Sequence, residues 1–281
     1  MAVDLHTHST ASDGSDDPAV LVERAQTMGL SAIALTDHDT LEGIEVARAA
    51  AEPTGIELIP GTELSLEYMG GMHLVVLWLA PGPGPLQDRL ASLQDGRTGR
   101  NAEIIALLGD QGMALTMEEV LDEAGGGSVG RPHIAAVMVR KGYATTIPEA
   151  FELWLAAGKP AYATRPRLSP EEAIGLAIRS GGVPVLAHPH TLGINRAQEM
   201  ANVLDRLRAA GLLGMEALYA GYHRHEREGY ADLARRFGLA VSGGSDYHGT
   251  YKEGLEIGRG YGDLVVPESI VEGLRERRPG S

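Results

Sequence analysis

The chain has 281 residues, of which 43% are hydrophobic and 22% charged, a composition typical of one large α/β domain, or one domain with a modest insertion. It contains no cysteine, which excludes disulfides, thiolate metal sites and a cysteine nucleophile, and leaves His, Asp and Glu as metal ligands, a set that suits Zn, Mn or Fe. The formal net charge of -14 argues against a general nucleic-acid coat protein but allows a small anionic substrate where cations line the site.

The first part of the chain alternates short β-rich runs with amphipathic segments. The predicted strands and helices follow one another as AVDLHTH (2–8), PAVLVERAQTMG (18–29), SAIALTDH (31–38), LEGIEVARAAAEPTG (41–55), IELIPGTELSLEY (56–68) and MHLVVLWLA (72–80). Each helical segment lies between two strand-like segments, and this order is typical of βαβ units.

The segment APGPGP (80–85) interrupts this pattern, and the chain from there to about residue 160 contains only helix-like segments. We therefore expect a helical cap, residues 81–159, inserted into a barrel formed by residues 1–80 and 160–281. Tyr143, Phe151 and Trp154 are the obvious aromatic residues of the cap, and the last two lie in an amphipathic run that predicts core positions. Few aromatic residues are then left for nucleobases to stack on.

The βαβ order returns in the last part of the chain. The predicted elements there are SPEEAIGLAIRSGG (169–182), VPVLAHPH (183–190), AQEMANVLDRLRAAG (197–211), GMEALY (214–219), REGYADLARRFG (227–238), LAVSGGSD (239–246) and PESIVEGLRER (267–277). Ser169 and Glu172 have capping-box spacing, and Gly29, Gly211 and Gly238 lie where helices are expected to end. Repeated β/α units on both sides of the cap predict a (β/α) barrel.

No basic segment followed by a long apolar run precedes the first strand, and no apolar run approaches the ~18 residues of a membrane span. The sequence therefore predicts a cytoplasmic protein with no membrane partner, and it contains no sign of an obligate protein partner.

Nine potential metal ligands lie at or next to strand ends, which in a barrel meet at one mouth. They are His6, His8, Asp13, His38, Glu63, His73, His188, Asp246 and His248. A single strand-end histidine such as His73 is more often a satisfied core residue. Two imidazoles on one strand face, as in His6-Thr7-His8, would be costly to bury without a metal.

Nine ligands are too many for one divalent ion, so we expect two or three ions of Mn, Fe or Zn. Three such ions would exceed the ligand charge by about three, which a phosphate and a bridging hydroxide would neutralise. Divalent ions lower the pKa of bound water to about 7, so attack on phosphorus by a metal-bound hydroxide is expected. Asp37 and Asp39, on either side of His38, are interpreted as hydrogen-bonding partners or caps rather than ligands.

The motifs DLHTHSTASDGS, ALTDHDT, GTELS, VLAHPH and GGSDYH resemble, in order, those of the polymerase-and-histidinol-phosphatase (PHP) family of metal-dependent phosphoesterases. The segments SVGRPHIAAVMVRKG, GKPAY and YAGYHRHE resemble the subgroup that includes 3',5'-nucleotide bisphosphate phosphatases and a 5'-3' exoribonuclease. The resemblance implies a distorted (β/α)7 TIM-like barrel with an inserted helical cap. It also implies three ligand sets: His6, His8, Glu63 and Asp246; Glu63, His73 and His188; and Asp13, His38 and His248.

Substrate contacts are expected from four residues. Arg131 and His133 lie at the start of a predicted cap helix, where backbone N–H groups and an arginine form an anion site, so both are expected to bind phosphate, and Arg131 also to assist catalysis. His223 precedes a helix and is expected to protonate the leaving oxygen or bind phosphate. His190 replaces an arginine of some relatives, so a contact there is expected to be weaker or pH-dependent. Lys159, Arg165 and Arg167 are interpreted as a solvated loop.

Three functions are compatible with these residues. The leading one is a phosphatase that hydrolyses a phosphate monoester of a small nucleotide, such as a 3',5'-nucleotide bisphosphate. The second is a 5'-3' exonuclease on short RNA or DNA, which would need an open groove and stacking aromatic residues. The third is a non-catalytic metal-binding scaffold, which should have lost some ligands, whereas every expected position is filled.

Overall fold

Seven strands form one sheet and lie side by side in chain order. The computed structural model describes residues 1–68, 71–125 and 129–280, so Ser128, the first residue of SVGRPHIAAVMVRKG, lies outside the described residues. The strands are β1 (Ala2–Asp4), β2 (Leu30–Leu35), β3 (Glu57–Leu66), β4 (Met72–Leu77), β5 (Val183–Ala187), β6 (Gly214–Tyr219) and β7 (Ala240–Gly244). They correspond one for one to the seven predicted strands.

The sheet curves into a nearly closed barrel. Neighbouring strands are parallel, except that β4 is antiparallel to both β3 and β5. The segments that follow β1 and β7 join the two edges, because Asp246 donates its N–H to the carbonyl of His6 at 2.9 Å and His8 donates to Tyr247 at 2.9 Å. The predicted barrel is therefore confirmed, and the reversed β4 is the distortion.

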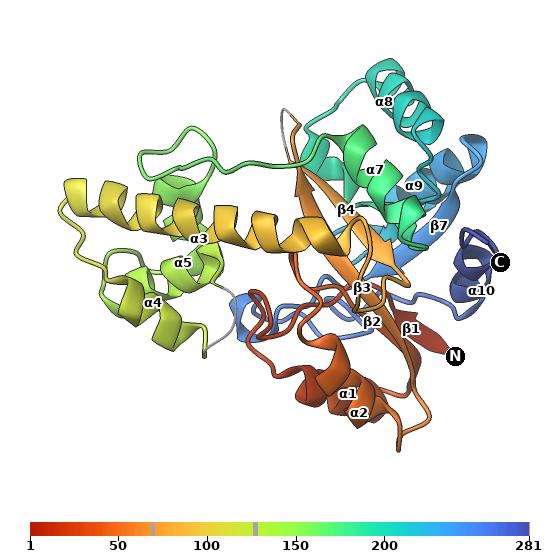
Figure 1. Cartoon of the computed structure of the whole chain (residues 1–281), viewed down its shortest axis with the longest axis horizontal. Coiled ribbons are helices and arrows are strands. Elements are labelled where there is room, and N and C mark those ends of the chain that lie inside the picture. The colour runs from red at the N-terminus through yellow and green to blue at the C-terminus, as the bar shows by residue number, and fades with distance from the viewer. Residues whose placement is uncertain (69–70, 126–128, 281) are drawn as a thin grey trace.

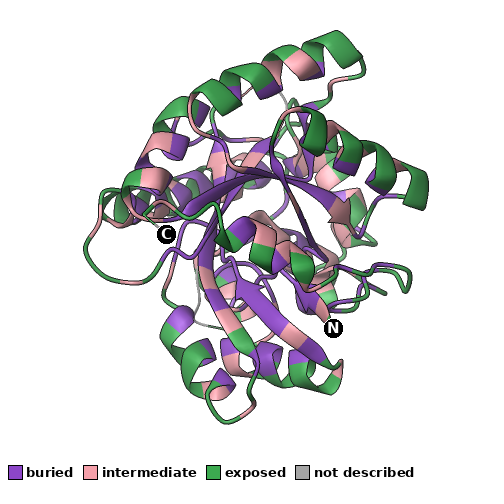
Figure 2. Ribbon diagram, turned by 90° about the vertical axis from the view of Figure 1, so that its right-hand side faces the viewer, coloured by how far each residue is buried: buried purple, intermediate pink, exposed green. Residues whose placement is uncertain are grey.

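Six helices cover the outside of the barrel. They are α1 (Pro18–Thr27), α2 (Ile44–Ala51), α7 (Pro170–Arg179), α8 (Ala197–Ala209), α9 (Arg224–Arg236) and α10 (Ser269–Arg275). Figure 2 shows that the strands at the centre are mostly buried, whereas the helices expose their outer faces. The predicted cap of α7 is present, since the Ser169 hydroxyl accepts a hydrogen bond from the Glu172 N–H at 3.2 Å. None of the helices described is both long and apolar enough to span a membrane.

The segment between β4 and α7 is helical, as expected. It contains α3 (Gln87–Asp110), α4 (Met117–Glu123), α5 (Arg131–Arg140), α6 (Ile147–Ala150) and the π-helix η1 (Phe151–Leu155). In Figure 1, α3 runs from the barrel to the small helices α4 and α5. Its beginning packs with the barrel through Leu90 and Leu93, and its end joins a separate core through Ile104 and Leu108. The division into a barrel and a cap at residue 81 stays a prediction, and the two cores meet within α3.

Candidate metal centre

The nine predicted ligands converge on one site, most of them from the segments that follow strands. His6 and His8 follow β1, Asp13 lies in the next loop and His38 follows β2, whereas His188 follows β5. Two ligands lie within strands, since Glu63 is in β3 and His73 is in β4, where His73 pairs with Ser65. Glu63 and Ser65 are two residues apart on one strand, so Glu63 and His73 share the inner face of the sheet. Asp246 and His248 follow β7 and complete the group.

Glu63 is the central residue of this group and is almost completely buried. Five imidazoles contact its two carboxylate oxygens. Oε2 lies 3.2 Å from His6 Nε2, 3.2 Å from His8 Nε2 and 3.3 Å from His38 Nδ1, and Oε1 lies 2.8 Å from His73 Nδ1 and 3.0 Å from His188 Nε2. The two oxygens thus face different sets of histidines, which is the arrangement that a ligand bridging two ions requires.

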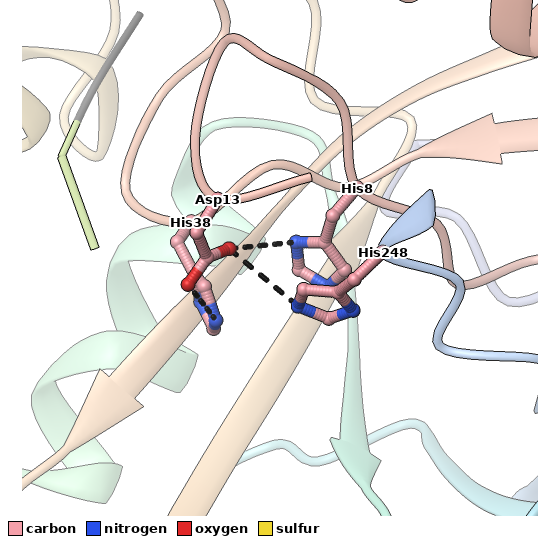
Figure 3. A group of neighbouring side chains, drawn as sticks. All are labelled: His8, Asp13, His38 and His248. Atoms are coloured by element: carbon pink, nitrogen blue, oxygen red, sulfur yellow. Dashed lines mark ion pairs between the residues drawn. The ribbon is translucent and has the colours of Figure 1, made fainter. Parts of the chain in front are cut away.

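The first predicted ligand set, His6, His8, Glu63 and Asp246, lies together, with its ligand atoms within 4.8 Å of one another. In the third set, Asp13 Oδ1 is 3.5 Å from His248 Nε2 and Asp13 Oδ2 is 3.9 Å from His38 Nε2, with His8 beside them (Figure 3). The second set is held through Glu63 Oε1, which contacts His73 and His188.

The donor atoms fit cations. His6 Nε2 and His8 Nε2 lie 3.2 Å from Glu63 Oε2, but among the described residues neither of these atoms nor His8 Nδ1 forms a hydrogen bond, although both side chains are almost completely buried. Unpaired polar atoms at such depth are costly unless something binds them. The donor atoms of the cluster are imidazole nitrogens and carboxylate oxygens, a set that suits Zn, Mn or Fe. The metal dependence expected from the sequence thus has a buried site that matches it.

The charges of the cluster also favour cation binding. Burial alone would raise the pKa of Glu63, but His38, His6 and His73 hold it well below its usual value, so the carboxylate is ionised. The pKa of Asp13 is lowered in the same way by His38 and His248, against the effect of burial. Burial lowers the pKa of His38 to about 3, which keeps its imidazole neutral. Burial also acts to lower the pKa of His6 and His8, but the neighbouring carboxylates raise that of His6 well above its usual value and that of His8 to about 9, so these two imidazoles lose a proton when they bind a cation. Ionised carboxylates and neutral imidazoles are the forms that coordinate metal.

A second layer of carboxylates fixes these ligands, and the sequence did not reveal one of its members. Glu216, buried on β6, contacts His6 Nδ1 at 3.1 Å and accepts a hydrogen bond from the His188 N–H at 2.8 Å. The sequence feature that could have indicated Glu216 is its position as a single acidic residue within the apolar run GMEALY. Asp37 is a hydrogen-bonding partner, as expected, because it accepts from the Ser9 hydroxyl at 2.6 Å and the Ser12 hydroxyl at 2.5 Å.

Glu216→Gln is expected to weaken metal binding by about 10- to 100-fold while the protein stays folded, because the carboxylate orients His6 and supports its basicity. Titration of metal-depleted protein with Mn²⁺, followed by calorimetry, measures the change. Glu228→Gln on the exposed face of α9 is the matched control. An affinity equal to that of the control would show that Glu216 does not tune the ligands.

The cluster forms one wall of a cavity of about 260 Å³. Cap residues form another wall, namely Arg97 and Arg100 from α3, Arg131 from α5 and Phe151 from η1. Arg167, Tyr219 and Lys252 also line it. The Lys252 ammonium donates to Asp246 Oδ2 at 2.5 Å, and the Tyr219 hydroxyl donates to the same oxygen at 3.2 Å. These two contacts leave Asp246 Oδ1 facing His6 and His8.

Five arginines gather beside this cavity, and one carboxylate pairs with two of them. Asp39 Oδ2 accepts from Arg97 Nη2 and from Arg165 Nη2, each at 2.6 Å. In the described part of the chain, Arg100, Arg131 and Arg167 form no ion pair with a carboxylate. Burial and the neighbouring guanidinium groups lower the pKa of Arg100.

The interpretation of residues 159–167 as a solvated loop was wrong for two of its three cations. Arg165 is 8% exposed and bound to Asp39, and Arg167 lines the cavity. The sequence could not indicate this burial, because Asp39, which pairs with Arg165, lies 126 positions away from it in the chain. Lys159 is exposed, as expected.

Three of the predicted substrate contacts do not line the cavity formed by the described residues. His133 is buried, and its Nδ1 accepts from the Gly130 N–H at 3.1 Å, which caps α5. His190 is exposed and its Nδ1 contacts the Tyr222 hydroxyl at 3.0 Å. His223 is exposed at the start of α9, where its ring stacks on His225. The proton-donor role of His223 therefore stays a prediction, because His223 does not line the cavity formed by the described residues. Arg131 does line the cavity.

Comparison with known proteins gives consistent matches. Residues 4–112 match the PHP domain family. A 3',5'-nucleoside bisphosphate phosphatase of Chromobacterium violaceum is 32% identical over 91% of this chain and 90% of its own length. A 5'-3' exoribonuclease of Haemophilus influenzae is 35% identical over 87% of this chain and 89% of its own length.

A solved structure from Bifidobacterium adolescentis, described provisionally as a metal-dependent phosphoesterase, superposes with a TM-score of 0.86 at 31% identity. The superposition covers 98% of this chain and 96% of that one. Sequence and fold therefore agree over nearly the whole length of the chain.

Proposed function

Because the chain belongs to the PHP family of metal-dependent phosphoesterases, we propose that it hydrolyses a phosphate monoester of a small nucleotide carrying a second phosphate, such as a 3',5'-nucleotide bisphosphate. The observation that carries this proposal is one cavity with a wall of potential metal ligands and a wall of arginines. One wall holds the His, Asp and Glu cluster, and the other holds arginines without carboxylate partners among the described residues. A substrate with two phosphates would fill both.

The proposed cofactors are two or three divalent ions of Mn, Fe or Zn held by the nine ligands. The proposed sets are His6, His8, Glu63 and Asp246; Glu63, His73 and His188; and Asp13, His38 and His248. Bound there, such ions would lower the pKa of water and neutralise phosphoryl oxygens. Glu216, Asp37 and Lys252 hold ligands or the loops that carry them, so the cluster is organised before substrate arrives.

The proposed site for the second phosphate contains Arg100, Arg131 and Arg167. A buried guanidinium that lacks a carboxylate partner is costly in the free protein, and an anion that pairs with it removes that cost. Arg131 also begins α5, and Pro132 at the same helix start lines the cavity as well. Arg97 is less able to bind a substrate phosphate, because its guanidinium group already donates to Asp39. Arg100 is buried, Arg131 and Arg167 are partly buried, and all three would recognise phosphate through charge-assisted hydrogen bonds.

The size of the cavity supports a small substrate. A volume of about 260 Å³ is close to the lower end of ligand pockets, roughly 300 Å³, and helices of the cap close over it. The nucleotide bisphosphate phosphatase at 32% identity is one relative of this kind.

A 5'-3' exonuclease on short RNA or DNA is the second candidate, and a specific groove favours it. This groove of about 1030 Å³ meets the cavity at Arg167 and is also lined by Tyr68 and Arg206. The Arg206 guanidinium lies 5.9 Å from the centre of the Tyr68 ring. A strand longer than one nucleotide has room there, and an aromatic ring suits its bases.

Release of inorganic phosphate and of mononucleotides from a panel of substrates, followed by chromatography, tests the two candidates. Manganese-loaded enzyme is given a nucleoside 3',5'-bisphosphate, the two corresponding monophosphates and a short 5'-phosphorylated oligoribonucleotide. The arginine site is expected to make kcat/KM for the bisphosphate about 10- to 100-fold higher than for either monophosphate.

Equal kcat/KM values for bisphosphate and monophosphates would overturn the bisphosphate proposal. A higher value for the oligoribonucleotide, with mononucleotide products, would establish the exonuclease instead.

A further inference from the structure

Phe151 is an unusual residue for the wall in which it lies. The other cavity residues from the cap are three arginines and Pro132, and the opposite wall consists mainly of imidazoles and carboxylates. Phe151 is partly exposed, and it also packs against the cap core. A phenyl ring has no charge and no hydrogen-bond donor with which to bind a phosphate. Its position in the cavity wall therefore suits an apolar, flat part of the ligand.

Phe151 begins a π-helix and packs against the cap core, as the sequence periodicity predicted, but it also borders the cavity. The N–H of Ala156 donates to the carbonyl of Phe151 at 2.9 Å, five residues back instead of four. This wider turn shifts the following side chains out of the 3.6-residue pattern. π-Turns of this type are frequent at functional sites.

Arg131 fixes the ring from one side. Its guanidinium carbon lies 5.6 Å from the centre of the Phe151 ring, and its Nη1 donates to the carbonyl of Leu155 at 3.1 Å. Arg131 also lines the cavity. A ligand can therefore meet the phenyl ring and the guanidinium together, and a planar aromatic group with a nearby phosphate satisfies both.

The second aromatic residue of the described cavity wall is less suited to this role. The Tyr219 hydroxyl donates to Asp246, a proposed metal ligand, and its ring contacts the rings of His188 and His190. A base stacked there would compete with the group that holds the metal ligands. Phe151 makes no such contact and lies on the cap.

We propose that Phe151 is the platform on which the nucleobase stacks, so that the cap selects nucleotides over other phosphorylated sugars. This inference rests on the proposed nucleotide substrate. The ester phosphate lies at the ligand cluster, the second phosphate at the arginines and the base against Phe151, next to Arg131. The metal cluster supplies the chemistry, and Phe151 supplies the specificity.

The test separates base recognition from phosphate recognition. Phe151→Leu keeps an apolar side chain but removes the ring, and Phe151→Tyr restores it. KM and kcat are measured for the nucleoside bisphosphate, together with inhibition constants for a nucleoside 5'-monophosphate and for ribose 5-phosphate, which has no base. Trp154→Phe, in the same π-helix and away from the described cavity wall, is the matched control.

We expect Phe151→Leu to raise KM for the bisphosphate and the inhibition constant of the nucleoside monophosphate by about tenfold. The inhibition constant of ribose 5-phosphate and kcat should stay as in the wild type, and Phe151→Tyr should restore KM. The inference would be overturned if Phe151→Leu raised the inhibition constants of the nucleoside monophosphate and of ribose 5-phosphate equally, or raised neither. If the wild type hydrolyses nucleotides in the same experiment, the proposed function still stands. A wild type that releases phosphate from no nucleotide would overturn the proposed function, and the inference with it.

Discussion

Glu63→Gln is expected to lower kcat/KM for phosphate release by at least about a thousandfold and to reduce the metal content of the protein. Glu63 contacts five imidazoles through two oxygens, so it is the residue through which the ligand sets are connected. An amide of the same shape has one acceptor instead of two, and its NH₂ group repels a cation. Steady-state kinetics and elemental analysis of the purified variant measure both effects.

Glu52→Gln is the control for the Glu63 variant, because it makes the same chemical change at an exposed position at the end of α2. Circular dichroism and the melting temperature of both variants establish that they are folded. A folded Glu63→Gln protein with the activity and the metal content of the control would show that Glu63 bridges nothing.

Arg100→Met is expected to raise KM for a nucleoside bisphosphate by about 10- to 100-fold and to leave kcat/KM for the monophosphates unchanged. Arg100 donates to the Asn101 side chain and, in the described part of the chain, to no carboxylate. Its charge is therefore free to pair with a substrate anion. Methionine keeps much of the length and the apolar stem, so the loss is confined to the charge and its hydrogen bonds.

Arg89→Met is the control for this variant. Arg89 lies on the same helix, α3, but is half exposed and pairs loosely with Glu172 at 3.6 Å, so its loss is expected to change little. Arg100→Met would contradict the second phosphate site if it impaired hydrolysis of the monophosphates and of the bisphosphate to the same extent. Arg100 would then act on the ester phosphate or on the fold.

The barrel could be predicted from the sequence because its signals are local. Each strand is a short apolar run bounded by turn residues, and the ligands stand at or near the ends of those runs, as in SAIALTDH. The topology then brings together residues as distant as His6 and Asp246. Helix ends could also be predicted from the sequence, since Gly29 and Gly238 adopt positive φ at the expected ends of α1 and α9.

The arginine wall could not be predicted, because its residues look like any solvated helix or loop until their partners are known. Arg97 lies 58 positions from Asp39, and Arg165 lies on the far side of the cap in the sequence. The same limit applies to Glu216, whose role depends on a ring 210 positions away. His223 is a different case, because it follows a strand but does not line the cavity formed by the described residues, so its role stays a prediction.

Removal and return of metal test the central claim most directly. The protein is depleted with a chelator, its metal content is measured, and phosphate release from a nucleoside bisphosphate is recorded before and after addition of Mn²⁺, Fe²⁺ or Zn²⁺. We predict that activity disappears with the metal, returns with at least one of the three ions, and does not return in Glu63→Gln. Full activity in protein shown by elemental analysis to hold no metal would contradict the account.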